Sequence, residues 1–200
     1  MAEEFSTEVD LPAPAEEVFR HLTEPAAMIR WMGQHATLTP VPGGAFEVDI
    51  NGVPVRGRYL EVDPPRRVVV SWGVAGNTDI PPGATEVEFT LTPTAGGTRL
   101  RLVHRGLSGG QEEIHAAGWQ HFLARLTRAA AGHDPGPDPW SQGTLRAPGT
   151  LRTRAVEQAG QQPGELGALR AGQRREQLVL DGGQHLVEAL QARRSASGSC

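Results

Sequence analysis

Residues 97–106 read Gly-Thr-Arg-Leu-Arg-Leu-Val-His-Arg-Gly, and the pair Gly118-Trp119 follows a short distance downstream. The alternation of polar and apolar side chains in the first stretch is typical of a half-buried strand. Beyond it, aromatic and apolar side chains recur at spacings of four, three and four, which predicts one stripe on a helix. That stripe consists of His115, Trp119, Phe122 and Leu126. The two patterns together predict a strand that leads into a long helix.

The helix is expected to run from about Ser108 to about Ala131. Ser108 and Gln111 have the spacing of a capping box, and Gly132 is a suitable C-terminal stop. About twenty residues at roughly 1.5 Å each give a length of about 30 Å. A helix of that length can cross a whole sheet.

The chain upstream of this helix predicts an antiparallel meander with short turns. The strongest turn signal is Asn51-Gly52, because both residues tolerate positive φ in a hairpin. Two short helices are expected before the meander, one beginning near Pro14 and the next restarting at Pro25. The expected strands lie at 5–11, 46–50, 53–62, 68–72, 87–91 and 100–104. The fold class is therefore α+β: a curved antiparallel sheet wrapped around a long C-terminal helix, with two short helices after the first strand.

Composition and charge argue against several classes of protein. The formal net charge is −4, and every basic residue is an arginine. Because Ala, Gly and Pro are also abundant, the arginines reflect coding bias rather than phosphate recognition, and no nucleic-acid partner is expected. No apolar run approaches the roughly 20 residues of a membrane helix, and the acidic N-terminus does not resemble a signal peptide. We therefore expect a cytoplasmic protein without a membrane partner.

A change in composition near residue 140 predicts a domain boundary. The segment 134–139 reads Asp-Pro-Gly-Pro-Asp-Pro, which cannot be helical. Residues 1–140 carry 11 arginines against 18 acidic residues, whereas residues 141–200 carry 8 against 5. We expect one domain over 1–140 and a low-complexity tail over 141–200 that is disordered or weakly helical.

Several short motifs, met in order along residues 5–140, resemble those of one family. They are 9–19, Arg30-Trp31, 43–46, 61–66, Ser71-Trp72, 97–100, 104–107 and 115–119. The chain resembles the bacterial relatives of the activator of the 90-kDa heat-shock protein ATPase, within the START-like (SRPBCC, birch-allergen-like) helix-grip superfamily. The resemblance implies a helix-grip fold with a cavity between helix and sheet. It does not define the function, because such folds host carriers, cyclases, hydrolases and chaperone partners.

The predicted site is the pocket between the long helix and the sheet. Aromatic walls with a few polar groups are typical of small-ligand sites. Six residues are predicted to form the wall: Trp31, Trp72, His104, His115, Trp119 and Phe122. Ordinary core packing explains the same tryptophans, and a buried histidine is often bonded to backbone or to another side chain. Both interpretations remain open for each residue.

Three functions fit these observations. The first is binding of a small hydrophobic or amphipathic ligand, which we prefer to catalysis. The second is an enzyme of the cyclase or dehydratase kind, with His104 or His115 as general base. The third, implied by the resemblance alone, is a co-chaperone that stimulates a chaperone ATPase. A chaperone or a second copy of the chain is then a candidate partner.

We expect neither a cofactor nor a metal ion. The single cysteine, Cys200, permits no disulfide framework and no cysteine-based metal site within one chain. The histidines show no metal-binding spacing, since His115 and His121 are six residues apart and point to different faces of the helix.

Overall fold

The computed structural model describes residues 3–108 and 110–141. In chain order the elements are β1 (Glu3–Leu11), α1 (Ala15–Thr23), α2 (Pro25–Met28), β2 (His35–Leu38), β3 (Ala45–Ile50), β4 (Val53–Asp63), β5 (Arg67–Trp72), β6 (Thr85–Thr94), β7 (Gly97–Leu107) and α3 (Gln111–Ala130). The tail expected over 141–200 lies outside the described residues, except for Ser141. Within the described part of the chain, no helix is both long and apolar enough to span a membrane.

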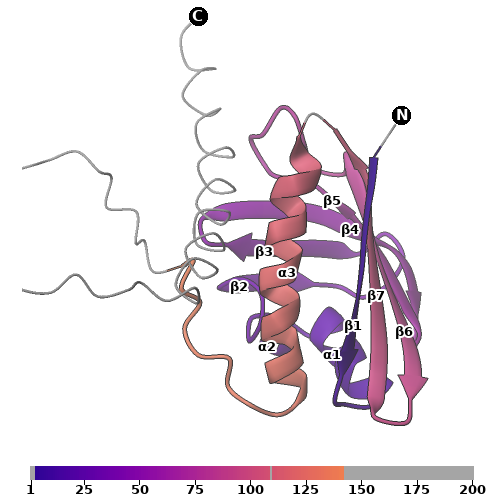
Figure 1. Cartoon of the computed structure of the whole chain (residues 1–200). Coiled ribbons are helices and arrows are strands. Elements are labelled where there is room, and N and C mark those ends of the chain that lie inside the picture. The colour runs from indigo at the N-terminus through magenta and orange to yellow at the C-terminus, as the bar shows by residue number, and fades with distance from the viewer. Residues whose placement is uncertain (1–2, 109, 142–200) are drawn as a thin grey trace, which may run out of the picture.

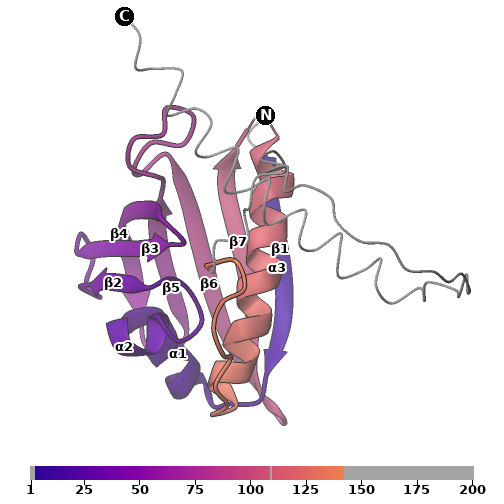
Figure 2. The same cartoon turned by 90° about the vertical axis from the view of Figure 1, so that its left-hand side faces the viewer.

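The strands form one antiparallel sheet in the order β1-β7-β6-β5-β4-β3-β2. The sheet curves around α3, which runs along its concave side, while α1 and α2 lie near the C-terminal end of α3 (Figures 1 and 2). This arrangement confirms the predicted α+β class. The Asn51-Gly52 turn is also confirmed, with φ of 51° and 83° at its two residues.

One strand was missed, and one local prediction was wrong. Strand β2 was not predicted, because its four residues lie at the sheet edge and none of them is buried. A side-chain cap by Ser108 was expected at the start of α3, but the N-cap is Gly110 in the left-handed conformation, without a side-chain hydrogen bond. Ser108 contributes only its carbonyl oxygen, which accepts a bond of 3.2 Å from the Gln111 amide. Glycine adopts this left-handed conformation without strain, and it places the N-cap two residues after Ser108.

The core lies between α3, the two short helices and the concave face of the sheet. The predicted stripe on α3 is buried along its whole length. Trp31 and Tyr59 are among the largest fully buried side chains, and each has its polar tip satisfied. The Trp31 indole donates to the His21 carbonyl oxygen at 3.0 Å, and the Tyr59 hydroxyl donates to the Leu22 carbonyl oxygen at 2.8 Å. The Tyr59 bond fixes α1 against β4, and the Trp31 bond fixes the segment after α2 against α1.

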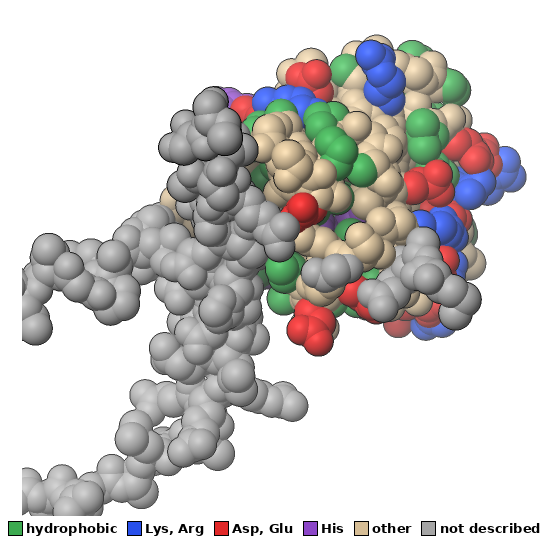
Figure 3. Space-filling model, turned by 90° about the horizontal axis from the view of Figure 1, so that it is seen from above, with side chains coloured by type: hydrophobic (Ala, Val, Ile, Leu, Met, Phe, Trp, Pro, Cys, Tyr) green, Lys and Arg blue, Asp and Glu red, His purple; other side chains and the backbone are tan. Residues whose placement is uncertain are grey.

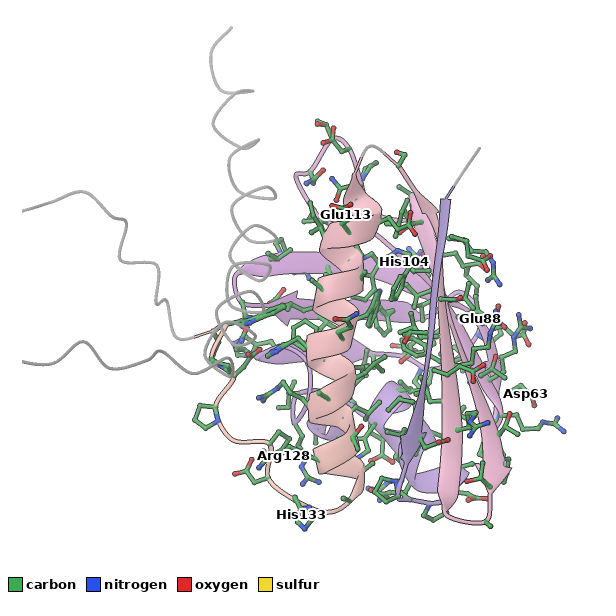
Figure 4. The ribbon with its side chains drawn as sticks, viewed as in Figure 1. Asp63, Glu88, His104, Glu113, Arg128 and His133 are labelled. Carbon is green, nitrogen blue, oxygen red and sulfur yellow. The ribbon has the colours of Figure 1, made fainter. Side chains whose placement is uncertain are left out.

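The outer face of the sheet carries a network of ion pairs centred on Glu88. Its carboxylate accepts hydrogen bonds from Arg67 at 3.0 Å and from Arg105 at 2.8 Å. Acidic and basic side chains gather along this edge of the molecule in Figure 3, and Figure 4 labels Glu88 on the outer side of the strands. Burial by itself raises the pKa of Glu88, but the bonds from the two arginines outweigh it and lower the pKa to about 2.

Glu88→Gln is expected to destabilise the fold at pH 7 by about 1–2 kcal/mol. The folded pKa lies below the unfolded value, so the carboxylate contributes stability above about pH 4.5, and this contribution is lost as the pH falls toward about 2. The expected size is smaller than the pKa shift alone implies, because both arginines are more than one-third exposed.

Urea unfolding of Glu88→Gln and wild type from pH 7 to pH 2 measures this contribution. Glu8→Gln is the matched control, because the Glu8–Arg101 pair is exposed on both sides and its atoms are 3.9 Å apart. We expect that control to change stability by less than about 0.5 kcal/mol. A Glu88→Gln difference that stays constant across the pH range would contradict the assigned role of the carboxylate.

Candidate functional site

A small apolar cavity lies between α3 and the hairpin end of β3, β4 and β5. Its volume is about 50 Å³, and it is partly open to the surface. That is room for one or two water molecules, whereas sites for drug-sized ligands usually measure about 300–1,000 Å³. The residues that line it are Met32, Ile50, Asn51, Val53, Val55, Trp72, Val74, His115, Gly118, Trp119, Phe122 and Trp140.

The structure places four of the six predicted wall residues at this cavity: Trp72, His115, Trp119 and Phe122. Trp31 and His104 do not line it. Trp31 is fully buried elsewhere in the core, where it bonds to His21. His104, labelled in Figure 4, is also fully buried. It lies on β7, and its ring centroid is 6.0 Å from that of Trp119 on α3.

Both ring nitrogens of His104 are engaged in a chain of hydrogen bonds. The Trp119 indole donates to His104 Nδ1 at 3.1 Å, so the ring proton lies on Nε2. Nε2 then donates to Thr85 Oγ1 at 2.9 Å, and the Thr85 hydroxyl donates to the Trp72 carbonyl oxygen at 3.0 Å. Burial, and to a lesser extent the charge of a protonated His115, lowers the pKa of His104 to about 2. His104 is a neutral positioning residue that fixes the Trp119 indole.

His115 differs from His104, although their rings meet edge to face at 4.9 Å. Its Nδ1 donates to the Gln111 carbonyl oxygen at 2.8 Å, one turn earlier on α3. The lone pair therefore lies on Nε2, which has no hydrogen-bond partner among the residues that the structure describes. Burial lowers the pKa of His115, although the bond to Gln111 opposes this. At neutral pH the cavity is thus lined by an uncharged imidazole with a free acceptor nitrogen.

A second polar atom near the cavity lacks a partner. The Trp72 indole N–H is buried and makes no hydrogen bond within the described residues. An unpaired buried donor costs about 1–3 kcal/mol. No group of three or more His, Cys, Asp or Glu side chains suited to a metal ion occurs in 3–108 and 110–141.

The sequence did not predict most of the cavity-lining residues on the sheet, nor Trp140, which follows α3 in the chain. Val53 and Val55 could have been found, because they alternate along the strand that follows the Asn51-Gly52 turn. Trp140 carried no such signal, since it follows a proline-rich segment that was interpreted as a domain boundary. Its place at the cavity depends on how that segment folds back along α3.

Comparison with known families identifies the chain. The model of the family described as "Activator of Hsp90 ATPase homolog 1-like protein" matches residues 12–131. The chain belongs to this family. The predicted membership of the START-like superfamily and the helix-grip fold are confirmed. The matched span includes all the cavity-lining residues except Trp140.

Solved structures and a curated protein show the same relationship. An AHSA1-like protein from Rhizobium etli is 35% identical, with a TM-score of 0.57, over 82% of this chain and 96% of that chain. DynU16, described as a putative protein in the dynemicin biosynthetic locus, is 27% identical, with a TM-score of 0.58, over 66% of this chain and 49% of that chain. An uncharacterised protein of Schizosaccharomyces pombe is 26% identical over 121 residues. The match spans 60% of this chain but only 34% of the length of that protein.

Proposed function

We propose that this AHSA1-like protein binds a small apolar or amphipathic molecule in the cavity between α3 and the sheet. The observation that carries the proposal is an apolar cavity, partly open to the surface, whose lining includes an imidazole with a free acceptor nitrogen. Burial of apolar ligand surface supplies the driving force, at roughly 25 cal/mol per Å². A ligand hydroxyl bonded to His115 Nε2 would fix the orientation.

The unpaired indole N–H of Trp72 supports the same proposal. A ligand that enters beside Trp72 and carries an oxygen atom could accept this bond and remove the cost of the orphaned donor. The bound molecule would then contact one donor and one acceptor in an otherwise apolar site. A hydroxyl group is the smallest group that satisfies both.

An enzymatic function is the second candidate, and His115 favours it. A neutral imidazole with a free lone pair can take a proton from a bound molecule. His104 is unsuited to that role, because both of its nitrogens are engaged. Native mass spectrometry of molecules retained by the purified protein separates the two functions. A binding protein returns its ligand unchanged after incubation, whereas an enzyme returns a product.

Titration with the fluorescent probe N-phenyl-1-naphthylamine tests the proposed binding. We expect saturable binding by wild type and at least a tenfold loss of affinity in Gly118→Leu, because the new side chain projects from α3 at the cavity. Leucine is a better helix former than glycine by roughly 0.8 kcal/mol. Because Gly118 is buried and the cavity is small, overpacking is expected to cost about 1–3 kcal/mol. Urea unfolding therefore checks that Gly118→Leu is folded before the titration.

Two comparisons complete this titration. Gly96→Leu is the matched control, because Gly96 is an exposed turn glycine with open space beside it. His115→Leu should lower the preference for 1-naphthol over naphthalene about fivefold, the value of one hydrogen bond. The absence of probe binding by wild type, or equal binding by wild type and Gly118→Leu, would overturn the proposed function.

A further inference from the structure

Residues 132–141, which we name the strap, turn back after α3 and run beside it toward β3 (orange in Figures 1 and 2). Gly132 permits the turn with φ of 77°, and Figure 4 labels Arg128 and His133 at this end of the helix. Arginine side chains hold the first half of the strap through its carbonyl oxygens. Arg125 donates to Gly136 at 2.9 Å, and Arg30 donates to His133 at 3.3 Å.

The second half of the strap is held by the carboxylate of Asp138. One oxygen accepts a bond of 2.8 Å from His121 Nε2 on α3 and a bond of 3.0 Å from the Trp140 amide. The other oxygen accepts a bond of 3.3 Å from Asn51 Nδ2 in the β3–β4 turn. A single side chain therefore connects the strap, the helix and the hairpin.

Trp140 is positioned by this connection. Its ring stacks on His121 with centroids 3.9 Å apart and an interplanar angle of 8°, and it meets Phe122 edge to face at 5.8 Å. Of the residues that line the cavity, Trp140 and Asn51 are only half-buried, whereas the others are buried. The mouth of the cavity therefore lies between these two side chains, and Asp138 bonds to both residues.

The geometry points to the strap as a lid for the cavity, with Asp138 as the latch that ties the strap at Trp140 to the hairpin at Asn51. This inference rests on the proposed function. With the lid in place the cavity has about 50 Å³, too little for the naphthalene ring system of the probe. The lid joins no strand ladder and is held by a few side-chain bonds, so it can open without breaking the sheet. A ligand enters when the Asp138 bonds break and Trp140 moves away from Phe122.

Stopped-flow binding of N-phenyl-1-naphthylamine to Asp138→Ala tests the lid. Release of the latch should raise the association and dissociation rate constants together, each about tenfold, while Kd changes less than threefold. If Asp138 only supported the wall of the cavity, its substitution would change mainly the dissociation rate constant. Asp134→Ala is the matched control, because its side chain bonds within the strap, to the Gly136 amide, rather than at the mouth.

A second measurement needs no ligand. Hydrogen exchange of the strap peptide should be faster in Asp138→Ala than in wild type, while the β6 and β7 peptides exchange unchanged. Probe binding with association rates equal in wild type and Asp138→Ala would overturn the lid and leave the proposed function standing. Failure of wild type to bind the probe would overturn the proposed function, and the lid with it.

Discussion

His104→Leu is expected to lower the free energy of unfolding by about 3–4 kcal/mol. The substitution keeps an apolar side chain in the core but removes the acceptor of the Trp119 indole and the donor to Thr85. The indole N–H is then buried without a partner, because Trp119 is only 3% exposed. Urea unfolding followed by far-ultraviolet circular dichroism measures the loss.

His133→Leu provides the control for His104→Leu. His133 is exposed. Its carbonyl oxygen accepts a bond from Arg30 and its amide donates to the Arg128 carbonyl oxygen, so the substitution leaves both bonds in place. We expect a change within about 0.5 kcal/mol. If His104→Leu were as stable as this control, the hydrogen-bond chain would not hold Trp119, and the case against His104 as a proton acceptor would fail.

The two histidines show how far sequence could define the site. The alternation along residues 97–106 puts His104 on the same face as the apolar side chains of Leu100 and Leu102 and so predicts that it faces inward. The helical stripe predicts the same for His115, and the structure buries both. Sequence left open which of them could act on a ligand. That difference depends on Thr85 and Trp119, which approach His104 from two other elements, and no spacing along the chain indicates such a meeting.

The fold could be predicted in more detail than the site. Alternating strands, the Asn51-Gly52 turn and the stripe on α3 are local patterns, and each corresponds to an element in the structure. Strand β2 lacked a pattern because it buries nothing. The strap was missed for a different reason: prolines exclude a helix at 134–139 but do not show which surface the chain then covers.

The small volume of the cavity describes its closed state, in which the lid lies over the apolar walls. A rigid cavity of about 50 Å³ would be a packing defect. Here one of the two half-buried wall residues, Trp140, belongs to a segment held mainly by side-chain bonds. The walls on β4, β5 and α3 belong to the core and cannot move without loss of packing. Any widening must therefore occur on the side of Trp140 and Asn51.

Trp31→Ala is expected to cost about 4–5 kcal/mol, the largest loss among these substitutions. Trp31 is fully buried, its indole donates to the His21 carbonyl oxygen, and its own carbonyl oxygen accepts a bond of 3.2 Å from Arg125. Truncation leaves a large void between α1 and α3, which carry His21 and Arg125. Thermal unfolding of Trp31→Ala measures the loss. Trp140→Ala should cost far less, because that ring is half-buried.

Trp31→Phe keeps the variant folded and tests whether Trp31 belongs to the ligand wall. Phenylalanine retains most of the apolar volume and loses the bond to His21, so we expect a cost of about 1–2 kcal/mol. Because Trp31 does not line the cavity, the Kd for N-phenyl-1-naphthylamine should stay within twofold of wild type. If Trp31→Phe bound the probe tenfold more weakly, and Gly96→Leu did not, Trp31 would have to contact the bound ligand, as the sequence predicted. The bound ligand would then extend from the cavity to the region between α1 and α3 where Trp31 lies.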